Sequence, residues 1–375
     1  MKKKIIIISG AILIVALIVI ISLYVANEPT REWIDTYILR KNVIEEDLPT
    51  IALENENANV YAYDNHIVVL QENNLVIYNS SGKEETTINV SITTPIFADS
   101  GNYLLVADKN GQNVYLIYNT SLQWQKTMEG NISAITVNEN GAVGVVITGT
   151  TYKSVIVMYG ITGEEEFKTY LSSTIAADVA ISENSDYLSF AEIDTSGTII
   201  SSAVKTVSVE KAQSSPSEAI IYEYKPEENS LIVNIQYDNQ EIICQYDNTV
   251  YKMNEGNAQK LIDIDDKTTF MDINLHNYIC RIVETSSGIL SSQYEAKIMN
   301  PDNKKENSYL LNSVPKSLYC NNDIIAINMG NQIEFINHNA WLIKSFVSSQ
   351  SFKDVVLGKS VAGIIYRDRI EIISL

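Results

Sequence analysis

The sequence predicts an all-β fold, a β-propeller of eight four-stranded blades, together with one N-terminal transmembrane helix. One observation is an apolar segment that returns eight times between Ile67 and Val361, at a mean spacing of 42 residues. Another is a short repeated sequence pattern, called here the repeated phrase, in which a run of aliphatic and aromatic residues ends in a turn of Asn, Gly and Ser. A repeat of about 40–50 residues with short strands is typical of propeller blades. The eight segments are HIVVLQ, YLLVAD, VGVVIT, YLSFAEI, EIICQY, YICRIVE, DIIAIN and VAGIIY.

The chain begins with a basic tip, residues 1–4, and continues with residues 5–25, which carry no charge. As an α-helix these residues span about 31 Å, close to the roughly 30 Å hydrocarbon core of a bilayer. The run is longer than the apolar region of a cleaved signal peptide. Lysines precede it and acidic residues follow it, which predicts a cytoplasmic N-terminus and an extracytoplasmic bulk. We therefore expect a single-pass anchor in the cell membrane.

Residues 26–49 are expected to form a juxtamembrane helical stalk. Trp33, Ile34, Tyr37 and Ile38 would share one face of a short helix, and Pro49 would mark the start of the β region. This apolar stripe favours a spacer that packs against the base of the domain or lies at the level of the lipid headgroups. A helix that binds another membrane protein is the alternative.

The remainder, residues 50–375, is expected to form the propeller. The last unit supplies only three strands, so we expect the segment 50–53 to pair with it as its outer strand and close the ring. Seven blades are the alternative count, because the stretch 202–224 is irregular. The predicted blades cover residues 58–93, 94–131, 132–173, 174–224, 225–264, 265–311, 312–350 and 351–375.

The repeated phrase is expected to mark the end of the third strand of a blade and its turn into the outer fourth strand. Asn, Gly and Ser favour such turns because they tolerate left-handed backbone or bond to it with their side chains. Trp124 and Trp341, which follow two of these turns, are interpreted as blade-packing residues. The five phrases are LVIYNSSGKEE, VYLIYNTSLQW, VIVMYGITGEE, VYKMNEGNAQK and IEFINHNAWLI.

The formal net charge is −19, and the three basic residues at the N-terminus make the remainder more acidic still. Such a field repels phosphate groups, so nucleic-acid binding and docking of the propeller onto anionic lipid are not expected. Cys244, Cys280 and Cys320 have no spacing typical of a zinc site. They are interpreted as buried apolar residues, with one disulfide left open as an alternative.

The sequence predicts no catalytic, cofactor-binding or metal-ligating residue and no cofactor. The histidines His66, His276 and His338 have no metal-ligand spacing and are assigned to turns. Four aspartates form a second candidate metal site. Their spacing does not match that of a calcium-binding loop, and they are interpreted as a solvated acidic loop. Its members are Asp263, Asp265, Asp266 and Asp272.

The phrase from Tyr78 to Glu84, and its echo ending in Trp124, resembles the repeat of quinoprotein-like propellers, which include outer-membrane assembly scaffolds and quinone-dependent dehydrogenases. The basic tip, the apolar run and the stretch REWIDTYILRKNV look most like an uncharacterised family of membrane-anchored propeller proteins of Gram-positive bacteria. The resemblance implies the fold, and it implies no cofactor.

These observations favour a non-enzymatic extracytoplasmic binding or scaffolding module. Its expected partner is an envelope protein, a peptide or a wall polymer, which the loops of the propeller would engage. The alternative is an extracytoplasmic hydrolase or lyase whose carboxylates converge on one face of the ring. A quinone-dependent redox role is a third possibility.

Overall fold

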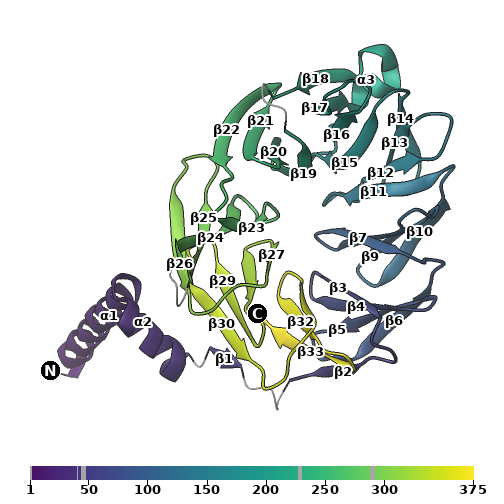
Figure 1. Cartoon of the computed structure of the whole chain (residues 1–375). Coiled ribbons are helices and arrows are strands. Elements are labelled where there is room, and N and C mark those ends of the chain that lie inside the picture. Colours follow the sequence, from purple (N-terminus) through teal and green to yellow (C-terminus); the bar gives the residue numbers. More distant parts are fainter. Residues whose placement is uncertain (1, 40, 44–47, 227–229, 288–291) are drawn as a thin grey trace.

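The computed structural model of the chain describes residues 2–39, 41–43, 48–226, 230–287 and 292–375. Eight sheets, each built on four antiparallel strands, form a ring of blades around a central axis (Figure 1). The prediction of eight blades is therefore confirmed, and the alternative of seven is wrong. Within each blade the first strand is innermost and the fourth is outermost.

The strands of the first four blades follow one another in a regular meander. Blade 1 contains β3 (Asn59–Tyr63), β4 (His66–Gln71), β5 (Asn74–Asn79) and β6 (Glu84–Asn89), and blade 2 contains β7 (Pro95–Ser100), β8 (Tyr103–Asp108), β9 (Asn113–Tyr118) and β10 (Ser121–Thr127). Blade 3 contains β11 (Asn131–Val137), β12 (Val143–Thr148), β13 (Ser154–Tyr159) and β14 (Glu165–Leu171), and blade 4 contains β15 (Ile175–Ile181), β16 (Tyr187–Asp194), β17 (Ser201–Ser208) and β18 (Ile220–Tyr224).

The second half of the ring repeats this order up to its last blade. Blade 5 contains β19 (Ile232–Asp238), β20 (Glu241–Tyr246), β21 (Thr249–Asn254) and β22 (Asn257–Asp263), and blade 6 contains β23 (Thr268–Asp272), β24 (Ile279–Ser287), β25 (Ser292–Met299) and β26 (Glu306–Leu311). Blade 7 contains β27 (Ser317–Asn321), β28 (Ile324–Asn328), β29 (Gln332–Asn337) and β30 (Leu342–Val347), and blade 8 contains β31 (Asp354–Leu357), β32 (Val361–Ile365) and β33 (Arg369–Ser374). All these strands lie within the predicted blade ranges, except that β11 begins one residue early.

The fourth strand of blade 8 comes from the other end of the ring. This strand, β2 (Thr50–Ala52), pairs antiparallel with β33, and Ile51 lies opposite Ile370. Ile51 is buried with residues of blades 8 and 1. The start and the end of the propeller are therefore joined in one sheet.

The core is divided among the interfaces between blades. Each of eight clusters of buried apolar side chains lies between two neighbouring blades. The second strand of a blade is buried on both faces, which explains its continuous apolar sequence, as in YLLVAD of β8. The smallest cluster lies between blades 5 and 6 and contains Ile243, Val250, Ile262, Ile273, Ile279 and Met299.

The repeated phrase occupies the hairpin between the third and fourth strands of five blades, as predicted. In blade 1 the side chain of Asn79 accepts hydrogen bonds from the backbone N–H groups of Ser81 and Lys83. Gly82 follows at φ +75°, and a Cβ there would lie 3.3 Å from the carbonyl oxygen of Thr50 in β2. The turn therefore needs glycine both for its backbone angle and for the approach of the closing strand.

The irregular stretch 202–224 contains an insertion between two strands of blade 4. After β17 the chain forms α3 (Val209–Ser214) and a 3₁₀ turn, η3 (Pro216–Glu218), before it returns as β18. The side chain of Ser208 caps α3 by accepting a hydrogen bond from the N–H of Lys211. The insertion leaves the four-stranded blade intact.

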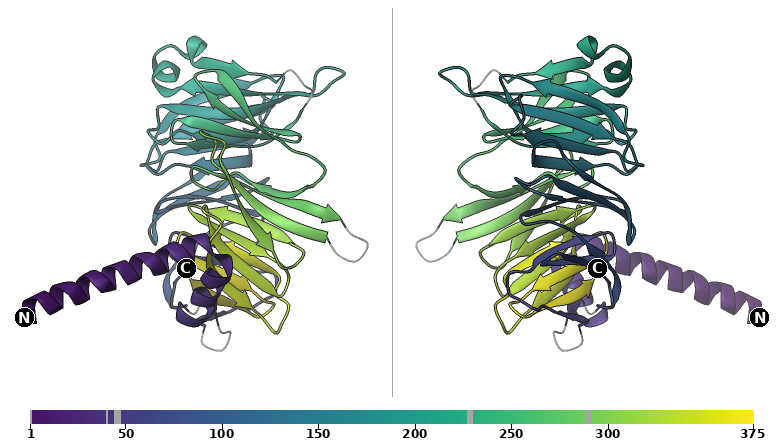
Figure 2. Two further views of the ribbon diagram at one scale, coloured as in Figure 1. Left: turned by 90° about the vertical axis from the view of Figure 1, so that its left-hand side faces the viewer. Right: turned by 90° about the vertical axis from the view of Figure 1, so that its right-hand side faces the viewer.

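The N-terminal segment lies outside the ring, beside β30 (Figure 1). It contains α1 (Lys2–Ala26), α2 (Glu28–Trp33), a short π-helical turn η1 (Ile34–Ile38) and β1 (Asn42–Val43). The helix α1 extends away from the body of the propeller (Figure 2). Within the residues described here, no helix meets the length and apolarity required to cross a membrane.

The stalk differs from the predicted single helix in its contacts. Ile34 is buried, whereas Trp33 and Ile38 are exposed, so the apolar stripe does not pack as one surface. The strand β1, which the sequence analysis missed, pairs in parallel with β30 and adds a fifth strand to blade 7. Backbone pairing therefore fixes the end of the stalk to the ring.

A polar network joins α1 to the stalk and to blade 7. Asp35 is 5% exposed, and its carboxylate accepts a hydrogen bond from the Tyr24 hydroxyl at 2.8 Å. The ammonium group of Lys41 lies 2.8 Å from the same carboxylate and also donates to the carbonyl oxygen of Leu342. Trp341 packs edge-on against Tyr24, which corrects its assignment to blade packing alone. Trp124, in contrast, packs between blades 2 and 3 as predicted.

Candidate functional site

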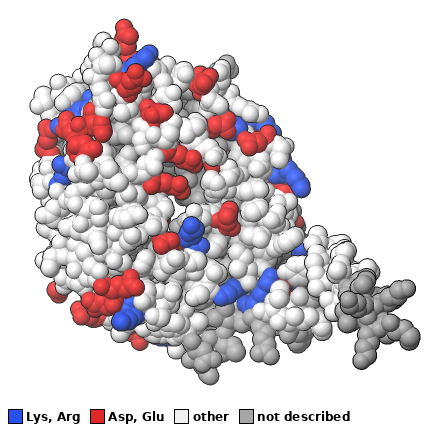
Figure 3. Space-filling view, turned by 180° about the vertical axis from the view of Figure 1, so that it is seen from behind, with Lys and Arg blue, Asp and Glu red and all other residues white. Residues whose placement is uncertain are grey.

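The inner strands of all eight blades line one central channel. Its cavity has a volume of about 630 Å³. Seen from behind, the ring is hollowed near its centre, and the charged side chains around the hollow are mostly acidic (Figure 3). Every blade contributes to this channel, and its volume lies within the roughly 300–1,000 Å³ typical of ligand sites, so we take it as the candidate site.

Four aspartates inside the channel come from alternate blades. The carboxylate of Asp99 accepts a hydrogen bond from the Tyr61 hydroxyl of blade 1 at 2.6 Å, and Asp354 accepts one from the Tyr319 hydroxyl of blade 7 at 2.7 Å. The other two carboxylates, those of Asp178 and Asp272, each accept a backbone N–H from the next blade, donated by Ile235 and Cys320 respectively. All four aspartates therefore link neighbouring blades.

The channel environment disfavours the charged form of Asp99, Asp178 and Asp272. Burial raises the pKa of Asp99 to about 6, against a smaller lowering by the hydrogen bond from Tyr61. Burial also raises the pKa of Asp178 to about 6 and raises that of Asp272, although backbone N–H groups oppose the shift. Folding therefore places ionisable groups where their charge is costly.

Three further acids form an arc at one mouth of the channel. Glu139 and Glu183 follow the inner strands of blades 3 and 4, and Asp238 ends the inner strand of blade 5. Because the first strand of each blade turns directly into the second strand of that blade, the ends of these first strands lie at the same mouth of the channel. We call Glu139, Glu183 and Asp238 the acidic arc.

Hydrogen bonds between turns hold the acidic arc in place. The side chain of Asn138 donates to the carbonyl oxygen of Ser182 at 2.8 Å, which joins blades 3 and 4. The N–H of Asn239 donates to the Glu183 carboxylate at 3.1 Å, which joins blades 4 and 5. The arc is thus part of a continuous polar rim over three blades.

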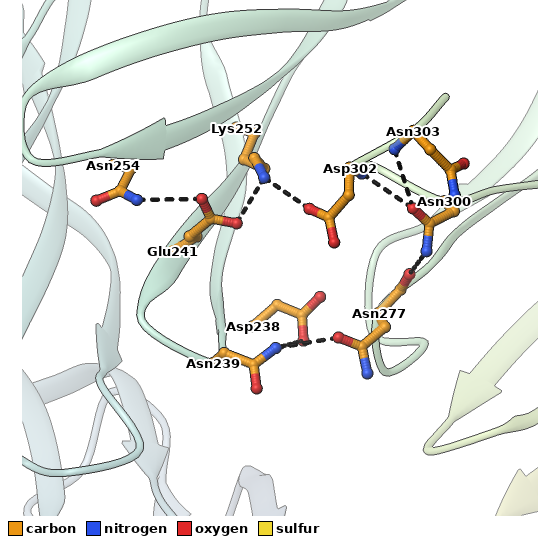
Figure 4. A network of polar contacts seen from close by, with 9 residues as sticks. All are labelled: Asp238, Asn239, Glu241, Lys252, Asn254, Asn277, Asn300, Asp302 and Asn303. Carbon is orange, nitrogen blue, oxygen red and sulfur yellow. Dashed lines mark hydrogen bonds and ion pairs between the residues drawn. The ribbon is translucent and has the colours of Figure 1, made fainter. Parts of the chain in front are cut away.

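The rim continues from blade 5 to blade 6 through a second network (Figure 4). The side chain of Asn239 donates to the side chain of Asn277 at 3.0 Å. Lys252 lies 2.6 Å from the Glu241 carboxylate and 2.7 Å from that of Asp302. This lysine is therefore already paired with two acids and does not neutralise the arc.

The charged side chains that line the channel are predominantly acidic. Its lining contains seven carboxyl side chains and, among the described residues, no lysine or arginine. Lys359 lies in the turn of blade 8, across the ring from the arc, and its N–H donates to the carbonyl oxygen of Asp64. Gln236 also lines the channel, and its buried Oε1 has no hydrogen-bond partner within the described part of the chain. The excess of carboxylates in the lining can therefore receive a cation.

The structure separates the three histidines. His276 lines the channel mouth, with Nδ1 3.6 Å from the Asp238 carboxylate. His66 lies 3.3 Å from Glu85, and the ring of His338 stacks on Tyr278 at 4.6 Å. They belong to blades 1, 6 and 7 and do not form one site.

The predicted acidic loop is also divided. Asp263 pairs with Lys260, and Asp265 accepts hydrogen bonds from Lys267 and Thr268 in its own turn. Asp272 is not part of a solvated loop, because it lies in the channel and bonds to blade 7. Across the described residues, no group of three or more His, Cys, Asp or Glu side chains is arranged to hold a metal ion.

The three cysteines, Cys244, Cys280 and Cys320, are buried, as predicted, and all are free thiols. Burial raises the pKa of the Cys320 thiol, which also contacts Cys280 from the neighbouring blade. The Cys320 thiol is therefore protonated at neutral pH.

Sequence reasoning missed the acidic arc and three of the four inner carboxylates, and it assigned the fourth, Asp272, to a solvated loop. Asp99, Asp178 and Asp238 lie near the ends of predicted first strands, in stretches such as PIFADSGN and DVAISENSD. The division of the sequence into blades could have indicated these sites, because acids at equivalent places in successive blades lie close together around the axis. The hydrogen-bond partners of the inner aspartates in neighbouring blades, 35 to 57 residues away, give no such signal.

Comparisons with known proteins describe the fold. A family model described as "Family of unknown function (DUF5711)" matches residues 45–375. None of the curated proteins matches the chain. The crystal structure of BamB from Moraxella catarrhalis is similar at a TM-score of 0.52 and 8% identity, over 87% of this chain and 98% of that one. The C-terminal WD40 domain of Sif2 is similar at a TM-score of 0.59 and 10% identity, over 87% and 98%.

Proposed function

The chain belongs to the family of unknown function DUF5711, and we propose that it is a non-enzymatic binding module that holds a basic segment of an envelope protein at its acidic channel mouth. The observation that carries this proposal is the acidic arc of Glu139, Glu183 and Asp238, held by hydrogen bonds between blades. A lysine or arginine side chain entering the mouth would meet several carboxylates and no competing cation of the lining.

The four inner aspartates already bond to neighbouring blades, so their first role is to hold the ring together. Binding would therefore rest on the mouth rather than on the deep interior.

We place the module outside the cytoplasm, held by residues 5–25 as a single-pass anchor. The uncharged run, the lysines before it and the acids after it support this placement. The test is protease added to intact cells or spheroplasts. A surface protein serves as the positive control, and survival of the propeller while that control is cut would refute the orientation.

Binding can be tested with a labelled peptide that alternates lysine and serine, measured by fluorescence polarisation on the full-length chain in detergent. The wild type should bind it, and affinity should fall as salt is raised. The variant Glu139→Gln/Glu183→Gln/Asp238→Asn should bind at least about tenfold more weakly.

The matched control removes three exposed carboxylates at the outer edge of blade 4, in Glu210→Gln/Glu218→Gln/Glu223→Gln. It changes the net charge equally and should leave affinity unchanged. Equal losses of peptide affinity in both variants would show a general charge effect and contradict binding at the acidic arc. Retention of wall material but not of the basic peptide would identify a wall polymer as the partner instead.

A second candidate is the hydrolase, which the raised pKa values of Asp99 and Asp178 in one channel favour. Turnover of a wall glycan that Asp178→Asn abolishes, while the acidic-arc variant retains it, would support this candidate. A quinone-dependent role is tested by the visible spectrum of the purified chain, which our proposal expects to be featureless.

A further inference from the structure

A second cavity, distinct from the channel, lies between blades 4 and 5. Its volume is about 290 Å³, near the lower end of the roughly 300–1,000 Å³ typical of small-molecule sites. It is lined by turns between first and second strands and between third and fourth strands. In a four-stranded meander both kinds of turn lie at the same end, so the pocket opens on the face that carries the acidic arc.

Four tyrosines form the walls. Tyr187 lies on β16, Tyr222 and Tyr224 lie on β18, and Tyr237 lies on β19, where it also lines the channel. Tyr237 is held by a hydrogen bond between its hydroxyl and that of Ser189 at 2.8 Å. It therefore separates the pocket from the channel.

Two of the other rings are also fixed by their neighbours. The ring of Tyr224 packs against that of Tyr251, with centroids 5.5 Å apart. The ring of Tyr222 lies against Gly256, where an added Cβ would come within 3.0 Å of it. Glu255 and Gly256 both have positive φ, which places this tight turn of blade 5 over the ring. The aromatic walls are therefore preorganised.

The floor of the pocket is apolar. Val204, Ile242 and Met253 are buried there. The one hydroxyl among the deeply buried lining residues belongs to Thr206, and it is already hydrogen-bonded to Ser189 at 2.8 Å. A ligand rich in hydroxyl groups, such as a sugar, would leave those groups without partners at this floor.

The rim is acidic. Asp186 and Glu255 are exposed at the opening, together with side-chain amides, and the described lining contains no lysine or arginine. Carboxylates at the rim favour a cation, and the faces of tyrosine rings attract one. The apolar floor favours a cation that carries methyl groups rather than a strongly hydrated one.

We propose that this pocket binds a small alkylated ammonium group, with tyrosine walls around the charge, the apolar floor against its methyl groups and the carboxylates of Asp186 and Glu255 at the rim. Enclosure of such a cation by aromatic rings is a known mode of recognition for quaternary ammonium ligands. The site is separate from the acidic arc and does not depend on the proposed partner of the channel.

The test is calorimetry of the full-length chain in a maltoside detergent, which carries no ammonium group, with choline as the probe. Its neutral isostere, 3,3-dimethylbutanol, is the matched probe, because it has the same shape without the charge. Choline should bind at least about tenfold more tightly than the isostere. Equal binding of the two, tighter binding of glucose, or no binding of choline up to about 10 mM would overturn the proposal.

Variants separate the cation site from general stability. Tyr222→Leu should lower choline affinity by about tenfold, whereas Tyr222→Phe, which keeps the ring face, should stay within about threefold. Glu255→Gln changes an exposed rim residue and should weaken binding about twofold to fivefold. Tyr170→Leu, on β14 and 52% exposed, is the control and should bind as the wild type does. Equal loss in Tyr222→Phe and Tyr222→Leu would overturn the role of the ring face.

Two sources of the ligand are distinguished by competition. A short-chain phosphatidylcholine that competes at least about tenfold better than choline identifies a lipid headgroup. Equal or weaker competition identifies a free solute. Both results support the ammonium chemistry, whereas loss of choline binding in the acidic-arc variant and not in Tyr222→Leu would place the ligand in the channel and overturn this assignment.

Discussion

Replacement of Asp99 by asparagine should stabilise the propeller at neutral pH and have little effect in acid. Burial raises the pKa of this carboxyl from 3.8 to about 6. At about 1.36 kcal/mol per pH unit, the difference corresponds to roughly 3 kcal/mol. Asparagine has a similar shape and keeps an oxygen that can accept the hydrogen bond from the Tyr61 hydroxyl.

The sign follows from proton binding. Between pH 4 and pH 6 the folded chain keeps the proton of Asp99 and the unfolded chain loses it. The stability associated with this group is therefore fully present below about pH 4 and is lost as pH rises through about 6. Above that range the carboxylate is charged in both states, and the folded state bears the cost of its burial.

The assay is thermal unfolding followed by tryptophan fluorescence at pH 4 and pH 7.5. With an unfolding entropy of about 2.1 cal/mol/K per residue, 3 kcal/mol corresponds to a Tm shift of about 4 °C for a chain of 375 residues. Asp99→Asn should raise Tm by up to about this amount at pH 7.5 and by less than about 1 °C at pH 4.

The control is Asp323→Asn, an exposed carboxylate that changes the net charge by the same amount. It should alter Tm by less than about 1 °C at either pH. If Asp99→Asn instead lowers Tm equally at both pH values, the bond to Tyr61 outweighs the burial of charge, and the reasoning is refuted.

Three further predictions concern the closing strand, the turns and the thiols. Ile51→Ala should lower the free energy of unfolding by about 2–4 kcal/mol, whereas Thr50→Ala on the exposed face should cost less than about 0.5 kcal/mol; equal effects in denaturant melts would show that β2 does not seal the ring. Gly82→Ala should cost about 1 kcal/mol more than Gly101→Ala, because both have positive φ but only the first meets β2; a smaller loss at Gly82 would contradict that contact. A thiol reagent should label none of the cysteines in the native chain and all of them in denaturant, and rapid native labelling would contradict their burial at Cys244, Cys280 and Cys320.

The eight-blade fold could be predicted because each blade repeats the same local solution. Second strands such as YLLVAD are buried on both faces, so their continuous apolar sequence recurs once in every blade, at intervals of 37 to 54 residues. The three-strand count of the last unit pointed to the segment 50–53, and β2 occupies that place. These signals are local in sequence or arise from simple counting.

The sites could not be predicted in the same way, because they arise between blades. The contact of Tyr61 with Asp99 joins residues of different units, and the tyrosine pocket depends on how β18 faces the turn at Gly256. The strand β1 was missed because two residues carry too little pattern to indicate a strand. Its place is set by the free edge of β30, which no local feature of the stalk encodes.

The attachment of the N-terminal segment to two blades has a mechanical consequence. Because β1 lies along β30 in blade 7 and precedes β2, which lies along β33 in blade 8, a pull on α1 would act on β30 before it acts on the closing strand. Tyr24, Asp35 and Lys41 take up the first part of that load at the foot of the helix. The attachment of β1 would therefore protect the pairing of β2 with β33, which closes the ring, from force applied at the N-terminal helix.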